Sequence, residues 1–135
     1  MKGVAVNGAA QAALVVLDSS CWLEYFSNSP FAERYAEAIG NTAALVVPII
    51  TIYEVYKVAL REFGVAHANQ AVALMREGQV IDVNLHLALS AAASRLPLAD
   101  SLIYATAQTR SAILWTQDAH FKGLPNVRYF PKDAC

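Results

Sequence analysis

The sequence has no large excess of charge of either sign. Ten lysines and arginines stand against eleven aspartates and glutamates, which gives a formal net charge of −1 over 135 residues. Proteins that attract nucleic acid over a whole surface are usually strongly basic. If this chain binds a nucleic acid, a local group of basic side chains must hold it.

Cysteine is scarce, and long hydrophobic runs are absent. Cys21 and Cys135 lack the spacing of metal ligands or of a disulfide framework. The longest apolar runs, Ala12–Leu17 and Ala43–Ile50, are well short of the ~20 residues that span a bilayer. The first residues also lack the basic region and the continuous apolar run of a secretory signal. We therefore expect a protein that is not inserted in a membrane and that works in the cytoplasm.

What the sequence does have is a surplus of hydrophobic residues, at 56% of the chain, where about 45–50% is usual. The length suits one domain, which we expect over residues 14–135, with residues 1–13 as an N-terminal extension. A surplus without a membrane span predicts a second buried surface, in a homodimer or against a partner protein.

Short β-favouring apolar runs alternate with helical patterns along the chain. Strands are expected at 14–17, 45–47, 80–83, 111–115 and 127–130, and helices at 20–26, 31–39, 51–64, 66–76, 85–95 and from Pro97 onward. Pro48 is expected to end the second strand because it has no N–H to donate. This alternation predicts an α/β fold with a parallel sheet and helices on both faces.

Four acidic residues follow strands or begin helices in this pattern: Asp18, Glu54, Asp100 and Asp118. In an open parallel sheet the functional crevice lies beyond the carboxyl ends of the strands. All four side chains are therefore expected over one edge of the sheet.

Each of these acids also has a purely structural explanation. Thr51 and Glu54 have the spacing of a capping box, and the aspartates suit helix caps, first turns or loops. Taken singly, the structural roles are favoured; the coincidence of four acids at corresponding positions favours a shared site. Clustered carboxylates repel unless a cation neutralises them, and oxygen ligands suit Mg²⁺ or Mn²⁺. The chemistry this predicts is metal-assisted phosphodiester hydrolysis.

The segments around these acids carry a resemblance to a known family. Leu17-Asp18-Ser19-Ser20, Thr51-Ile52-Tyr53-Glu54-Val55, Leu98-Ala99-Asp100-Ser101-Leu102-Ile103-Tyr104-Ala105-Thr106-Ala107 and Trp115-Thr116-Gln117-Asp118-Ala119-His120-Phe121 resemble, in order and spacing, the PIN domain of VapC-like toxin ribonucleases. The resemblance implies a three-layer α/β/α sandwich with a four- to five-stranded parallel sheet. It also implies a Mg²⁺- or Mn²⁺-dependent endoribonuclease of a type II toxin–antitoxin pair, which dimerises and is inhibited by a cognate antitoxin.

The same resemblance assigns roles to residues. Asp18, Glu54 and Asp100 match the three most regular acids of the family, and Asp118 matches the fourth. Ser19 and Thr116 match supporting hydroxyl positions. Many relatives have another acid where this chain has His120, which suggests a neutral or cationic phosphate contact there.

Two further expectations concern RNA and the partner. Lys57 and Arg61 follow Glu54 on its helix and, with Arg95, Arg110 and Lys122, are candidates for a local basic rim that binds RNA. The aromatic residues of 22–26 are expected to form core or interface contacts rather than a base-stacking platform. With residues 53–60 they are expected to line a groove for an antitoxin helix, whose basic side chain would reach the acidic site.

Two alternatives to a nuclease remain open. A PIN-like protein that binds RNA or a partner without cutting is one, although the four intact acids argue against it. A flavodoxin-like signalling domain with a phosphoacceptor aspartate is the other, and it has less support because only one acid follows the first strand.

Overall fold

The computed structural model describes residues 13–132. The expected N-terminal extension, residues 1–13, therefore lies outside the described residues except for residue 13. Five strands form one sheet: β1 (Val15–Leu17), β2 (Leu45–Pro48), β3 (Gln79–Ile81), β4 (Ile113–Thr116) and β5 (Val127–Tyr129). All neighbouring strands are parallel, in the order β3-β2-β1-β4-β5. The predicted parallel sheet is confirmed. The strand order differs from the flavodoxin-like order 2-1-3-4-5, which excludes that alternative.

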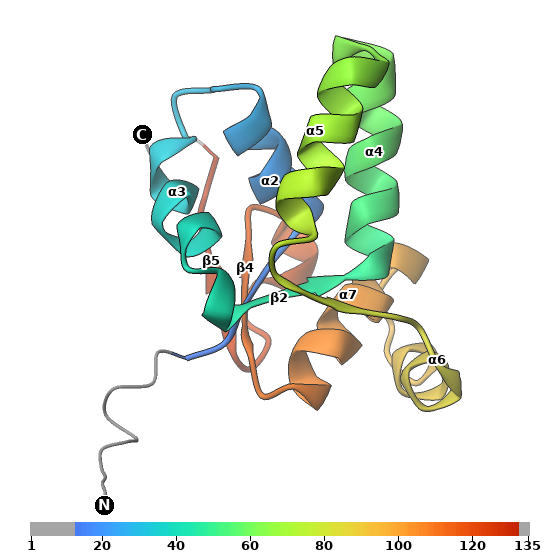
Figure 1. Ribbon diagram of the computed structural model, residues 1–135. Coiled ribbons are helices and arrows are strands. Elements are labelled where there is room, and N and C mark those ends of the chain that lie inside the picture. Colours follow the sequence, from blue (N-terminus) through green and yellow to red (C-terminus); the bar gives the residue numbers. More distant parts are fainter. Residues whose placement is uncertain (1–12, 133–135) are drawn as a thin grey trace, which may run out of the picture.

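Within residues 13–132, six α-helices cover the two faces of the sheet (Figure 1). They are α2 (Ser19–Phe26), α3 (Glu33–Gly40), α4 (Ile49–Phe63), α5 (Val65–Met75), α6 (Leu85–Ala92) and α7 (Leu98–Thr109), with short 3₁₀ helices η1 (Thr42–Ala44) and η2 (Ala119–Phe121). Figure 1 shows α4 and α5 packed side by side, joined at Gly64, whose φ of +89° suits glycine.

Alternating strand residues divide the core into two layers. Leu17, Leu45 and Val47 pack with α2, α3, α4 and α5. Val16, Val46 and Leu114 point to the other face and pack with α7 and η2, while α6 packs on α7. The expected three-layer α/β/α sandwich is confirmed. Trp22 is fully buried in the first layer, which confirms a core role and removes it from the surface of any groove.

The second strand ends at Pro48, as predicted, and includes that residue, one beyond the expected range 45–47. Pro48 is the last residue of β2 and lies opposite Ile81 of β3, a position where a carbonyl acceptor remains although the N–H is missing. Helix α4 then begins at Ile49 with Pro48 as its N-cap and no side-chain cap. Thr51 lies inside the helix, fully buried, so the capping box with Glu54 does not form. Glu54 is therefore free of that structural role.

Other boundaries shift by a few residues. The third strand covers Gln79–Ile81 rather than 80–83, because its partner β2 ends at Pro48 and offers nothing beyond Ile81 to pair with. Helix α6 ends at Ala92 rather than at residue 95, since the chain must leave the helical conformation before Pro97. Among the described residues, no helix is long and apolar enough to cross a membrane.

Candidate active site

Asp18 lies where β1 ends and α2 begins, at the centre of the sheet. Its side chain accepts a 2.7 Å hydrogen bond from the backbone N–H of Ser19 and so caps α2. A second 2.7 Å bond comes from the hydroxyl of Thr116, the last residue of β4. Because β1 and β4 are paired and parallel, their carboxyl ends bring these two side chains together across the sheet.

Thr116 also connects Asp18 to Asp118. Its hydroxyl oxygen accepts from the backbone N–H of Asp118 at 2.9 Å while it donates to Asp18. Thr116 is fully buried, so this hydroxyl has no competing water. One side chain thus fixes the positions of two of the four acids.

Glu54 and Asp100 reach the same edge from helices. Glu54 is on α4 and accepts a 2.9 Å hydrogen bond from the hydroxyl of Ser19, and Asp100 is in the first turn of α7. His120 joins the cluster from η2: its Nδ1 lies 2.9 Å from Oδ2 of Asp100 and 3.2 Å from Oδ1 of Asp118. The site therefore receives side chains from both helical layers.

A single pocket of about 450 Å³ collects these groups, and we call it the acidic pocket. Its lining includes all four predicted acids and Ser19. The full set is Asp18, Ser19, Ser20, Glu54, Asp100, Gln117, Asp118, Ala119 and Lys132. The expectation that four acids converge at the carboxyl edge of the sheet agrees with this geometry, whereas their catalytic role remains a prediction.

Burial sets the electrostatics of the pocket. It raises the pKa of Asp18 to about 6, against the hydrogen bond from Thr116, with a further increase from the charge of Asp100. Burial likewise raises the pKa of Glu54 and of Asp100. The hydrogen bond with Asp100 raises the pKa of His120. The pocket thus concentrates negative charge in a place where water screens it poorly.

These groups fit a divalent cation by their chemistry. Within residues 13–132, ligand atoms of Asp100, Asp118 and His120 lie within 4.8 Å of one another, and Asp18 and Glu54 add carboxylates to the same pocket. Carboxylate oxygens are preferred ligands of Mg²⁺ and Mn²⁺, and Mn²⁺ also accepts imidazole. The sequence suggests a phosphate contact for His120; in the structure its ring lies among the acids, against Asp100 and Asp118.

The predicted basic rim does not line this pocket. Lys57 lies over the ring of Tyr53, with its Nζ 5.8 Å from the ring centroid, and Arg61 pairs with Glu62 at 3.1 Å. Arg95, Arg110 and Lys122 are also absent from its lining. Contact of Lys57 and Arg61 with RNA stays a prediction.

Sequence reasoning missed three polar residues that do line the pocket: Ser20, Gln117 and Lys132. The first two are neighbours of predicted residues, so adjacency was an available signal. Lys132 had none, because its position depends on the path of the chain after β5.

Comparison with known proteins agrees with this fold. The family model described as PIN domain matches residues 15–126, and no curated protein sequence matches the chain. Among solved structures, a toxin–antitoxin complex from Klebsiella pneumoniae superposes with a TM-score of 0.73 at 24% identity, covering 84% of this chain and 95% of that one.

Two other structures are similar at lower identity. VapBC2 from Rickettsia felis, bound to a DNA fragment from its promoter, has a TM-score of 0.66 at 14% identity over 87% of this chain and 97% of that one. VapC20 of Mycobacterium tuberculosis, a Sarcin-Ricin loop cleaving toxin, has a TM-score of 0.66 at 15% identity, with 79% and 92% covered. The family match spans most of the sequence and includes all four acids of the pocket, so this chain belongs to the PIN domain family.

Proposed function

We propose that the protein is a Mg²⁺- or Mn²⁺-dependent endoribonuclease, the toxin of a type II toxin–antitoxin pair. The observation that carries the proposal is the convergence of Asp18, Glu54, Asp100 and Asp118 on one pocket of a PIN-domain fold. A structurally similar protein is described as a Sarcin-Ricin loop cleaving toxin, which supports RNA as the substrate. Such an enzyme would act in the cytoplasm.

Each side chain has a role in this proposal. Asp18, Glu54, Asp100 and Asp118 would hold the cation, and bound Mg²⁺ or Mn²⁺ would neutralise them and activate a water for attack on the phosphodiester. Thr116 and Ser19 are positioning residues, because their hydroxyls donate to Asp18 and Glu54. His120 would orient Asp100 and Asp118, or contact the phosphate as its protonated form.

The direct test of this function is the cleavage of RNA by the purified protein and by its Asp100→Asn variant. The substitution removes one charge and almost no volume, so the fold should persist while cleavage with Mg²⁺ or Mn²⁺ falls by about 10³-fold. Cleavage of a structured RNA is followed on gels, with EDTA as the metal-free reference.

Glu37→Gln is the matched control, because Glu37 is an exposed acid of α3. It should leave cleavage unchanged. A wild-type protein that cuts no RNA with either cation would support the alternative of a catalytically silent PIN-domain protein. Equal cleavage by Asp100→Asn would show that the acidic pocket is not the active site.

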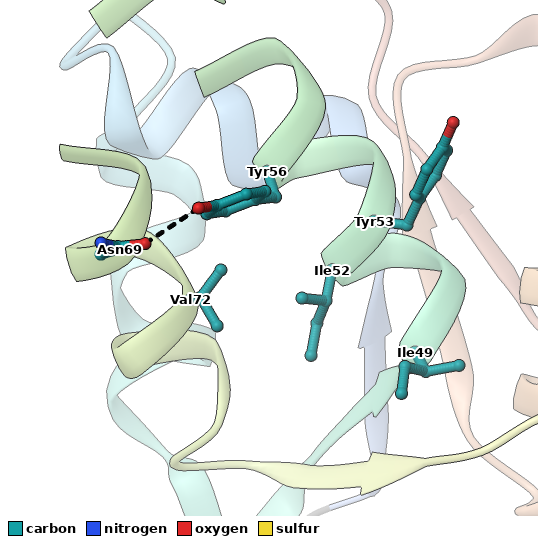
Figure 2. Close-up of a pocket in the computed structure, with 6 residues that line it drawn as sticks. All are labelled: Ile49, Ile52, Tyr53, Tyr56, Asn69 and Val72. Atoms are coloured by element: carbon teal, nitrogen blue, oxygen red, sulfur yellow. Dashed lines mark hydrogen bonds between the residues drawn. The ribbon is translucent and has the colours of Figure 1, made fainter. Parts of the chain in front are cut away.

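The partner of this toxin would be a cognate antitoxin, and apolar pockets beside α4 support that part of the proposal. One of about 270 Å³ lies between α2, α4 and α5 and is lined by Tyr25, Phe26, Ala59, Phe63, His67, Gln70, Ala71 and Leu74. Another, of about 490 Å³, lies between α4 and α5, where Figure 2 shows Ile52, Tyr56 and Val72 around one space and Tyr53 extending to the other side of α4.

Phe63→Ala and Tyr56→Ala, one from each apolar pocket, test the antitoxin site. We expect at least one of them to weaken binding to the cognate antitoxin about tenfold or more, since buried aromatic residues dominate such interfaces. Co-purification and calorimetry measure the effect. Val83→Ala is the control, because Val83 is 43% exposed and lines neither pocket. Binding that ignores both aromatic variants would place the antitoxin elsewhere.

The expected homodimer also stays a proposal. Leu85, Leu89 and Leu98 are 63–77% exposed on α6 and the start of α7, which makes this apolar face the best candidate for contact between two copies.

A further inference from the structure

Gln117 has a buried side chain whose polar atoms are unused. It is 4% exposed, and neither Nε2 nor Oε1 has a hydrogen-bond partner in the described part of the chain. It lies between Thr116 and Asp118, the two residues that anchor the acid cluster. A buried amide without partners destabilises a fold, because it has given up its hydrogen bonds to water.

The position of Gln117 distinguishes it from other buried polar groups without partners. Trp22 Nε1 and Thr51 Oγ1 are also unpaired, but neither residue lines the acidic pocket or the pocket beside it. Gln117 lines both. Both polar atoms of the amide are closed off from solvent in this conformation, so a rotation of the side chain is needed to turn the amide toward a ligand in either pocket.

The second of these pockets, which we call the flanking pocket, has a volume of about 320 Å³, at the lower end of small-ligand sites. It shares Ser20, Gln117 and Lys132 with the acidic pocket. Its full lining is Ser20, Leu23, Glu24, Ser27, Val58, Glu62, Phe63, Gln117 and Lys132. A chain-like ligand that places one phosphate at the acids would thus place its next unit here.

The lining indicates which part of an RNA chain fits. Lys132 lines both pockets, where an ammonium can bind a phosphate. The carboxylate of Glu24, in contrast, disfavours a phosphate in the flanking pocket, and that of Glu62 is paired with Arg61. Carboxylates and a glutamine amide form hydrogen bonds with the edges of bases, above all with amino groups. Phe63 adds an aromatic ring on which a base can stack.

We propose that the flanking pocket binds the nucleoside next to the cleaved phosphodiester, with the Gln117 amide reading its base and Lys132 holding a backbone phosphate. The inference rests on the proposed function. It further assigns the pocket a preference for bases that carry an amino group over uracil.

Gln117→Leu tests the role of the amide, because leucine fills similar space without polar atoms. We expect the melting temperature of the free protein to rise by about 3 °C and the affinity for a single-stranded RNA to fall about tenfold. Binding is measured by fluorescence anisotropy with Mg²⁺ in the Asp100→Asn background, so that cleavage is negligible while a cation can still offset the charge of the remaining acids. The same variant should lose the preference for an amino-bearing base over uracil at one position of the RNA.

Lys132→Met tests the phosphate contact through salt. It should reduce the slope of log affinity against log salt concentration by about 0.7, the effect of one lost phosphate contact on a single strand. The melting temperature should stay constant because Lys132 is exposed. If Lys57→Met changes the slope and Lys132→Met does not, the phosphate path runs elsewhere and that part of the proposal is wrong.

Several results would overturn the flanking pocket while leaving the nuclease intact. Full RNA affinity and unchanged base preference in Gln117→Leu would be one such result. If that variant folds poorly, Gln117→Met takes its place in the same test. A loss of antitoxin binding alone would assign the pocket to protein, and a lower melting temperature would show an internal structural role for the amide. A wild-type protein that neither binds nor cuts RNA would instead refute the proposed function itself.

Discussion

Asp18→Asn is expected to stabilise the metal-free protein at neutral pH while it abolishes cleavage. The pKa of Asp18 is raised from its ordinary value of 3.8 to about 6 in the folded chain, chiefly by burial. A folded carboxyl with a raised pKa binds its proton more tightly than the unfolded one. Its contribution to stability is therefore complete below pH 4 and is lost as the pH rises through 6.

The expected size of this effect is on the order of 3 kcal/mol between pH 4 and pH 8. Asparagine carries no charge at any pH; its amide oxygen can still accept from the backbone N–H of Ser19, while its amide NH₂ would donate to the hydroxyl oxygen of Thr116 instead of accepting from it. The two proteins should be about equally stable near pH 4, and the variant should be the more stable above pH 6. Denaturant unfolding in EDTA at a series of pH values measures the difference.

Cleavage should fall by about 10³-fold in the same variant, because a ligand of the cation is lost. Glu37→Gln is the control here as well, and it should alter neither the pH profile nor the activity. A variant of Asp18 that is less stable than the wild type at pH 7 would contradict the account, since it would mean that the buried charge is favourable.

Mn²⁺ is expected to bind the acidic pocket and to reverse this destabilisation. A cation at 100 times its dissociation constant raises the free energy of unfolding by about 2.7 kcal/mol, and it also relieves the repulsion among the carboxylates. Binding should weaken below pH 6, where protons compete for Asp18. Calorimetric titration and thermal unfolding with and without Mn²⁺ give the two readouts.

Asp18→Asn combined with Asp100→Asn should abolish both the heat of binding and the shift in melting temperature. Glu33→Gln combined with Glu37→Gln removes two acids from the exposed side of α3 and should change neither. Unaltered Mn²⁺ binding in the first pair would show that the cation lies outside the pocket.

The convergence of the four acids could be expected from the sequence because their placement follows from topology. Once short apolar runs are parallel strands, Asp18 and Asp118 must lie at one edge, and helix starts bring Glu54 and Asp100 to the same edge. Periodicity could not show that Pro48 itself belongs to the strand, since pairing with Ile81 depends on the neighbouring strand.

Contacts between side chains from distant parts of the sequence are harder still to predict. The sequence offers no sign that His120 contacts Asp100, or that Thr116 links Asp18 to Asp118, because each contact depends on the relative orientation of elements far apart in the chain. Lys132 and the unpaired amide of Gln117 escaped notice for the same reason. Burial without a partner is a property of three-dimensional packing alone.

The long separation of Asp18 and Thr116 has a consequence for the newly made chain. The two residues are 98 positions apart, and a ribosome adds that length in about 5 to 20 s. During this time β1 has no β4 beside it, and the acidic pocket is incomplete. Helices α2, α4 and α5, which line the candidate antitoxin groove, are all synthesised by Met75. Translation would therefore present the proposed antitoxin surface seconds before it completes the acidic pocket.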